Sequence, residues 1–149
     1  MEKRIGRGAL AALLGMVVWT GAFAAGEEVL VYKSPTCGCC NAWVDHLREN
    51  GFKVVTRDTD NLPVLKARLG VTRDVASCHT AVVDGYVVEG HVPAEVIRRL
   101  LAERPQVTGV AAPGMPVGSP GMEVPGQPAE PYDVVTFDAQ GRTALYERR

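Results

Sequence analysis

The sequence lacks an extended basic patch and, after Ala25, any long apolar run. Its 149 residues carry 16 Lys and Arg against 17 Asp and Glu, so the formal net charge is −1. Proteins that bind nucleic acid concentrate positive charge on one face, and no such concentration stands out here. No stretch after Ala25 reaches the roughly 20 apolar residues of a membrane-spanning helix. We therefore predict that the mature chain has no nucleic-acid partner and no membrane segment.

The first 24 residues have the pattern of a secretory signal peptide. Three basic residues precede the apolar stretch Ala9–Val18, and Ala22-Phe23-Ala24 fits the small-x-small cleavage rule. A twin-arginine pair and a lipobox cysteine are both absent, which favours the general secretory route; an uncleaved anchor is the alternative. We predict cleavage after Ala24, a periplasmic location and a single domain over residues 25–149.

Cysteines are few, and all four lie in two short motifs. Cys37-Gly38-Cys39-Cys40 holds three of the thiols, and Cys78 is followed by His79. Thiolates are the softest protein ligands and the best redox nucleophiles, so the motifs indicate soft-metal binding or disulfide chemistry. A structural disulfide is a third reading, although disulfide scaffolds usually spread their cysteines along the chain.

The Cys37 motif contains two nested patterns. Cys37 and Cys40 form a Cys-x-x-Cys pair, in which Cys37 would be the low-pKa nucleophile and Cys40 the resolving thiol of an oxidoreductase. Cys39 lies inside this pair, where a third thiol invites disulfide scrambling. A metal site gains from the same thiol, because thiolates can bridge soft ions. The extra thiol therefore favours metal binding.

The pattern of apolar residues alternates between strands and helices. Strands are predicted at residues 28–33, 52–57, 80–83 and 86–89, and helices at residues 40–50, 63–69 and 94–103. This order, β-α-β-α-β-β-α, is typical of an α/β domain of the thioredoxin-like class. It puts the Cys37 motif between the first strand and the first helix, whose positive end stabilises thiolates. Residues 132–149 are predicted to form a final hairpin around Gln140-Gly141.

Residues 105–131 are rich in Gly and Pro, which is typical of a linker. They contain two near-copies, Pro113-Gly114-Met115-Pro116 and Pro120-Gly121-Met122-Glu123. An exposed thioether has little core to fill but is a good ligand for Cu(I), so Met115 and Met122 are candidate metal ligands. The alternative is that these methionines only pin the loop onto the domain.

The chain resembles the DUF411 family, the CopG-like group of periplasmic copper-resistance proteins. The resemblance rests on four stretches of the sequence: Tyr32–Cys40, Cys78-His79-Thr80, Val88–Pro93 and the two Gly-Met copies. It covers essentially the whole mature chain. It implies a thioredoxin-like fold, copper binding and a role in copper handling in the periplasm, but it does not decide between an enzyme and a binding protein.

The resemblance and the donor types together predict a copper–thiolate site. Ordinary thioredoxins carry a cis-proline opposite their cysteine pair, whereas this chain has Ser77-Cys78-His79-Thr80 there. Cys78 and His79 would then face Cys37, Cys39 and Cys40, which is too many soft donors for one Cu(I). We therefore expect a small Cu(I) cluster. Zinc is the main competing metal, since four cysteines can form a tetrahedral site.

The other candidate side chains receive separate predictions. His91 is a candidate ligand near the same face. His46 lies among charged residues and is expected to be a solvated surface residue. Trp43 is expected in the core, where it could also shield the cluster from water.

Two functions follow from these predictions. The first is a copper-binding protein that sequesters Cu(I) or passes it to a copper efflux or chaperone protein. The second is an oxidoreductase that acts on protein disulfides or cycles copper between Cu(I) and Cu(II).

Overall fold

The computed structural model describes residues 27–149. The predicted signal peptide and its cleavage site lie outside the described residues. Within residues 27–149, no helix combines the length and the apolar character needed to cross a membrane.

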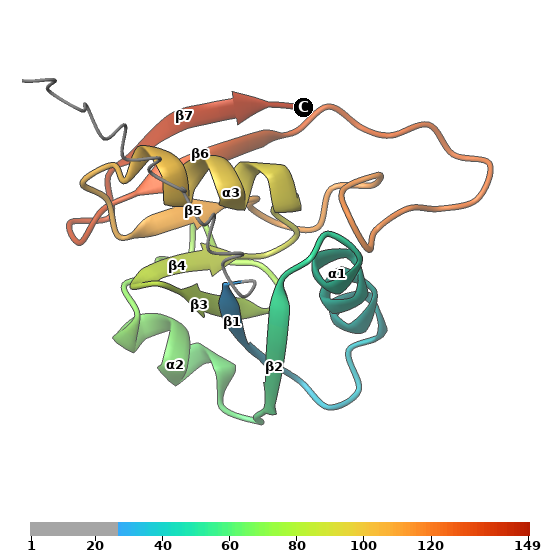
Figure 1. Cartoon of the computed structure of the whole chain (residues 1–149), viewed down its shortest axis with the longest axis horizontal. Helices are drawn as coiled ribbons and strands as arrows, with labels where there is room; N and C mark the ends of the chain where they lie inside the picture. The colour runs from blue at the N-terminus through green and yellow to red at the C-terminus, as the bar shows by residue number, and fades with distance from the viewer. Residues whose placement is uncertain (1–26) are drawn as a thin grey trace, which may run out of the picture.

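Residues 27–149 form a mixed α/β domain around a seven-stranded sheet with the order β2-β1-β3-β4-β5-β6-β7 (Figure 1). The strands are β1 (Glu28–Lys33), β2 (Lys53–Asp58), β3 (Thr80–Val83), β4 (Tyr86–Glu89), β5 (Gly109–Ala111), β6 (Asp133–Phe137) and β7 (Thr143–Arg148). The helices are α1 (Gly38–Glu49), α2 (Leu62–Arg68) and α3 (Ala94–Glu103). The pairs β1/β2 and β4/β5 are parallel, and the other neighbours are antiparallel.

Apolar side chains are buried on both faces of the sheet. Alternate residues of β1, such as Val29 and Val31, point into the main core with the apolar sides of α1 and α3. The opposite face buries a smaller cluster that includes Val75 and Phe137 and is covered by the segment after α2. This two-sided burial explains why the central strands read as nearly continuous apolar runs.

The first helix begins earlier than its apolar periodicity predicts. Cys37 is the N-cap of α1, and its Sγ accepts a hydrogen bond from the Cys40 N–H. Cys40, Trp43 and Leu47 then recur on one face of the helix and are fully buried. The cap therefore extends α1 to Gly38, and the cysteine motif forms its first turn.

Strand β5 was not predicted, because it lies within the Gly/Pro-rich segment 105–131. Gly109 begins this short strand, and a Cβ atom at that position would lie 1.8 Å from the Val87 carbonyl oxygen. A glycine is required there because the backbone of β4 approaches so closely. β5 pairs with β4 and β6, so the C-terminal hairpin of β6 and β7 extends the central sheet.

His46 is not a solvated surface residue, and that prediction is wrong. Its Nε2 accepts a hydrogen bond of 3.1 Å from the Ala94 N–H, at the start of α3. Pro93, the N-cap of α3, offers no side-chain acceptor, so the imidazole of α1 supplies the cap. Partial burial lowers the pKa of His46, against the opposing effect of Glu95.

We predict that His46→Ala destabilises the domain in a pH-dependent way. Loss of the cap should cost about 0.5–2 kcal/mol at neutral pH. The fold disfavours the protonated imidazole, so the contribution of His46 is complete above its unfolded pKa of about 6.5 and is lost as the pH falls below it. Urea denaturation at several pH values should show that the difference in unfolding free energy between wild type and variant becomes smaller below about pH 6.5.

The neighbouring variant Asp45→Ala is the matched control, because Asp45 forms only an exposed ion pair with Arg48. Its effect should be small and constant over this range. A difference in unfolding free energy between wild type and His46→Ala that grows toward low pH would contradict the capping role.

Candidate metal centre

The first turn of α1 carries three of the four cysteines at different depths. Cys37 and Cys40 form a disulfide, with Cys40 fully buried in the core. Cys39 is a free, half-buried thiol whose Sγ lies 3.5 Å from that of Cys37. The N-terminus of α1 directs its free N–H groups and positive dipole end at this turn, which favours thiolate there.

Cys78 faces this turn from the segment before β3. Its Sγ lies 3.9 Å from that of Cys39, and all four cysteine sulfurs lie within 4.8 Å of one another. The structure therefore brings together the four thiols that the sequence nominates as ligands. No cis peptide bond occurs in residues 27–149, so the cis-proline of ordinary thioredoxins has no counterpart there.

Two buried histidines extend the cluster on the other side of Cys78. His91 Nε2 lies 3.0 Å and His79 Nδ1 lies 3.3 Å from Cys78 Sγ. His91 Nδ1 lies 2.8 Å from the Pro120 carbonyl oxygen, which can only accept, so Nδ1 carries the proton and the unprotonated Nε2 faces Cys78. His79 Nε2 is buried without a hydrogen-bond partner. Cys78, His79 and His91 thus form a second donor group.

Burial sets the protonation of these groups in the metal-free protein. It raises the pKa of Cys78 to about 12, and the nearby Cys39 thiol adds to this. It also holds the pKa of His79 well below its usual value, assisted by His91 and Lys66, and lowers the pKa of His91. The imidazoles are therefore neutral, as ligation requires, and a metal ion would have to displace the Cys78 proton.

Trp43 covers the histidine side of the site. Its side chain is fully buried, as predicted, and its ring centroid lies 4.3 Å from that of His79. Its Nε1–H donates a 2.9 Å hydrogen bond to the Val92 carbonyl, directly after His91. The indole therefore excludes water from His79 and fixes the backbone that carries His91.

The Gly/Pro/Met-rich segment docks beside the site at two points, and its ribbon runs past α1 (Figure 1). The Gly114 N–H donates to the Ala76 carbonyl, and Ser77 Oγ donates to the Gly114 carbonyl. Gly121 lies against α1, where a Cβ atom would be 2.9 Å from the Cys39 carbonyl oxygen. The segment is thus a fitted part of the site and not a free linker.

The two methionines occupy different positions on this segment. Met115 is 54% exposed, whereas Met122 directly follows the docked Gly121 and is half-buried. Their role as copper ligands stays a prediction.

Comparison with known proteins relates this geometry to a family. The family described as "Protein of unknown function, DUF411" matches residues 75–122, which include Cys78, both buried histidines and both methionines. Two solved structures titled "Copper resistance protein copG", Form 2 and Form 1, are each 44% identical to this chain. The Form 2 structure matches with a TM-score of 0.78, and the match covers 83% of this chain and 98% of that chain. The Form 1 structure matches with a TM-score of 0.77, and the match covers 82% of this chain and 96% of that chain. A search of curated proteins gave no match.

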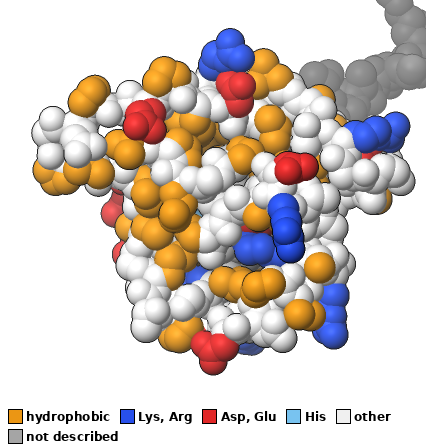
Figure 2. Space-filling view, turned by 180° about the vertical axis from the view of Figure 1, so that it is seen from behind, with side chains coloured by type: hydrophobic (Ala, Val, Ile, Leu, Met, Phe, Trp, Pro, Cys, Tyr) orange, Lys and Arg blue, Asp and Glu red, His pale blue; other side chains and the backbone are white. Residues whose placement is uncertain are grey.

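This chain belongs to the DUF411 family. The copper resistance protein copG is similar to it over more than four fifths of the chain, so a copper-related function is supported by the relatives as well as by the donor set. On the face drawn in Figure 2, acidic and basic side chains are interspersed without an extended basic patch.

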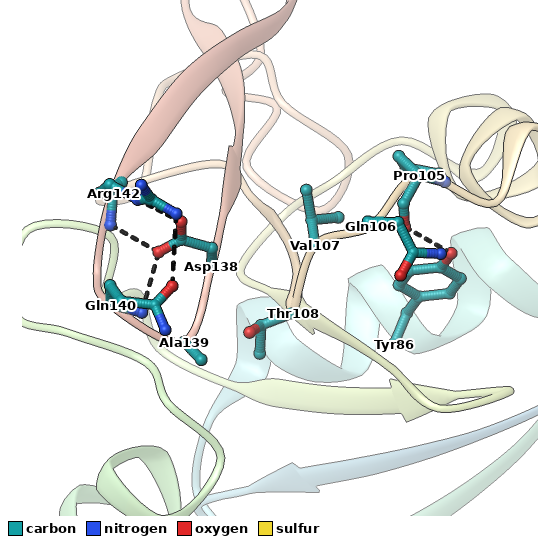
Figure 3. A pocket seen from close by; sticks show the side chains of 9 residues that line it. All are labelled: Tyr86, Pro105, Gln106, Val107, Thr108, Asp138, Ala139, Gln140 and Arg142. Atoms are coloured by element: carbon teal, nitrogen blue, oxygen red, sulfur yellow. Dashed lines mark hydrogen bonds and ion pairs between the residues drawn. The ribbon is translucent and has the colours of Figure 1, made fainter.

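The surface cavity drawn in Figure 3 is separate from the candidate metal centre of this DUF411 protein. Its volume is about 360 Å³, and it is lined by Tyr86, the segment 105–108 and the β6–β7 turn. Tyr86 begins β4, whereas His91 follows the other end of that strand. The cavity has neither cysteine nor histidine in its lining, so it offers no soft donor.

Sequence reasoning missed a group of polar residues around a buried carboxylate near Cys78. Glu89 is fully buried, and its carboxylate contacts Ser77, Lys66 and Thr80. The sequence did contain one sign of this group, because Glu89 is a carboxylate at the end of an otherwise apolar strand.

We predict that Gly121→Ala loosens the docked segment. The new methyl group would lie 2.7 Å from the Trp43 amide nitrogen and 2.9 Å from the Cys39 carbonyl oxygen, so the segment must lift from α1. Hydrogen exchange of residues 113–122 should become faster, and the melting temperature should fall.

Gly126→Ala is the matched control, because Gly126 has nearly the same positive φ but open space around it. Both variants carry roughly 1–2 kcal/mol of left-handed backbone strain. Equal destabilisation by the two substitutions would show that the Gly121 contact contributes nothing.

Proposed function

We propose that this protein binds copper as Cu(I) in a small thiolate cluster and acts in copper resistance. The observation that carries the proposal is that Cys78 belongs to both donor groups, one of four thiols and one of a thiol with two imidazoles. A thiolate shared in this way can bridge two metal ions. Thiolates prefer soft Cu(I), and the relatives are named copper resistance proteins.

The donor set fits copper better than a single zinc ion. Structural zinc sites are nearly always four-coordinate and tetrahedral, whereas the two donor groups that share Cys78 offer six soft or borderline donors in total. Both histidines also direct a ring nitrogen at Cys78 Sγ, His91 through Nε2 and His79 through Nδ1, as binding to a shared metal ion would require.

Full use of the thiols requires reduction of the Cys37–Cys40 disulfide. A dithiol reductant would supply two electrons and two protons, splitting the disulfide into two thiols and itself becoming a disulfide. Each thiol would then release its proton as it binds Cu(I). Cys39, Cys78 and the two histidines stay available in either state.

The same disulfide favours a second candidate function, a thiol–disulfide or copper oxidoreductase. Cys37 and Cys40 lie at the N-terminus of α1, and the elements from β1 to α3 follow the thioredoxin-like order β-α-β-α-β-β-α. In this candidate Cys37 is the nucleophile and Cys40 resolves the mixed disulfide. Its substrate would be a protein disulfide or copper itself.

The proposed setting is the periplasm, as the signal-peptide pattern of residues 1–24 indicates. There the protein would sequester Cu(I) or pass it to a copper efflux or chaperone protein. Met115 supports transfer, because its thioether is exposed and it follows Gly114, which is hydrogen-bonded to Ala76 and Ser77 just before Cys78. An exposed thioether is a suitable first or last ligand for a Cu(I) ion that is being transferred.

We predict that the reduced wild-type protein binds more than one Cu(I) per chain and that Cys39→Ser binds fewer. Cys39 Sγ lies within reach of both Cys37 and Cys78, so its loss removes the central sulfur of the cluster. Anaerobic Cu(I) titration with a chromophoric competitor, together with metal analysis, measures both stoichiometries.

Insulin reduction by the same variant separates the two functions. A plain dithiol oxidoreductase keeps its activity in Cys39→Ser, because Cys37 and Cys40 are intact. Saturation of the wild type at one ion per chain, or an unchanged copper count in Cys39→Ser, would contradict the cluster.

A further inference from the structure

One buried carboxylate lies next to the loop that carries Cys78 and His79, and it is not itself a proposed ligand. Glu89, at the end of β4, has no solvent exposure. Its Oε1 accepts a 2.7 Å hydrogen bond from the Ser77 N–H and also contacts the Lys66 ammonium. Its Oε2 accepts a 2.6 Å hydrogen bond from the Thr80 hydroxyl.

The partners of Glu89 flank the two ligands of the loop before β3. Ser77 immediately precedes Cys78, and Thr80 immediately follows His79. The carboxylate therefore joins the residues on both sides of Cys78-His79 to β4. The Lys66 ammonium also donates a 2.8 Å hydrogen bond to Thr80 Oγ1, and this bond connects Thr80 to α2.

Stability alone does not account for this arrangement. The Lys66 side chain is 12% exposed and that of Glu89 is fully buried, so both charges have lost most of their hydration. Buried ion pairs of this kind are often no better for stability than apolar residues of the same volume. A carboxylate does provide something that an apolar residue cannot, namely acceptors at fixed positions on both sides of the ligands.

We propose that Glu89 is a positioning residue of the metal centre, which orients Cys78 and His79 by holding Ser77 and Thr80. Lys66 keeps the carboxylate in place. The proposal rests on the copper site proposed above and assigns it a support that is needed for tight binding. Residues that orient metal ligands typically contribute 10–100-fold to metal affinity.

Two double variants separate positioning from charge. Glu89→Gln with Lys66→Met keeps an oxygen for the Ser77 N–H and an amide donor for Thr80 Oγ1. Glu89→Leu with Lys66→Met has a similar volume but no acceptor, so the Ser77 N–H loses its partner. Neither variant leaves an unpaired buried charge, and they differ only in the hydrogen bonds.

The first measurement is Cu(I) affinity of the reduced proteins by competition with a chromophoric chelator. We expect the Leu/Met variant to bind about 10–100-fold more weakly than wild type. The Gln/Met variant should stay close to wild type. Circular dichroism and thermal melting establish that both are folded.

The second measurement needs no metal. Iodoacetamide labelling of the reduced protein, followed by peptide mass spectrometry, gives a separate alkylation rate for each cysteine. Cys78 should react faster in the Leu/Met variant, because its loop is no longer held. Cys39 is carried by α1 and should keep its wild-type rate, which makes it an internal control.

A folded Leu/Met variant with wild-type affinity and wild-type Cys78 labelling would overturn the proposal. If the Leu/Met variant does not fold, Thr80→Val provides the test, since it removes the Thr80 hydrogen bond to Glu89 and keeps the ion pair with Lys66. This variant should bind Cu(I) more weakly and its Cys78 should be labelled faster. No change in either measurement would overturn the proposal. A wild-type protein that binds no copper would contradict the copper site instead, and Cys78 labelling would still decide the role of Glu89.

Discussion

The candidate metal centre depends on the burial of Trp43. This one side chain connects the three parts of the site that are far apart in the sequence. It lies on α1 three residues after Cys40, its ring packs against His79, and its Nε1–H holds the carbonyl next to His91. Its backbone nitrogen also faces the docked Gly121. Because Trp43 is fully buried in the main core, the energy that folds the domain also assembles the donors.

Around this core the site is arranged in two zones that meet at Cys78. One zone is sulfur-rich and lies at the N-terminus of α1, where the helix dipole favours thiolate. The other holds neutral imidazoles in a dry environment, and the Pro120 carbonyl fixes the tautomer of His91. The raised pKa of Cys78 follows from its place between the two zones, where burial and a neighbouring thiol both disfavour its charge. A cation in this position reverses that effect, because it stabilises the thiolate that the empty protein disfavours.

The sequence predicted most of the elements, because hydrophobic periodicity and turn residues are local signals. It also nominated the cysteines and histidines that the structure brings together, since their chemistry is visible in the residue types. Three features escaped because they depend on contacts between distant segments. Strand β5 is too short to show periodicity, and Gly109 is explained only by the approach of β4. His46 looked solvated on its own helix but caps α3, and Glu89 gains its role from the backbone and side chains around Cys78.

In the proposed copper site, the disulfide and the copper ions would compete for the same sulfur atoms. While Cys37 and Cys40 are bonded to each other, neither can act as a thiolate ligand, and the remaining donors are Cys39, Cys78 and the two histidines. Reduction adds two sulfurs to a donor set that is otherwise unchanged in composition. Copper capacity is therefore linked to the redox state of one cysteine pair. The linkage is reciprocal: Cu(I) bound to Cys37 and Cys40 stabilises the reduced form, because it binds thiolates and not the disulfide. In an oxidising compartment, bound copper would thus protect the thiols that hold it. The two proposed functions, copper binding and thiol redox chemistry, would then be two states of one site.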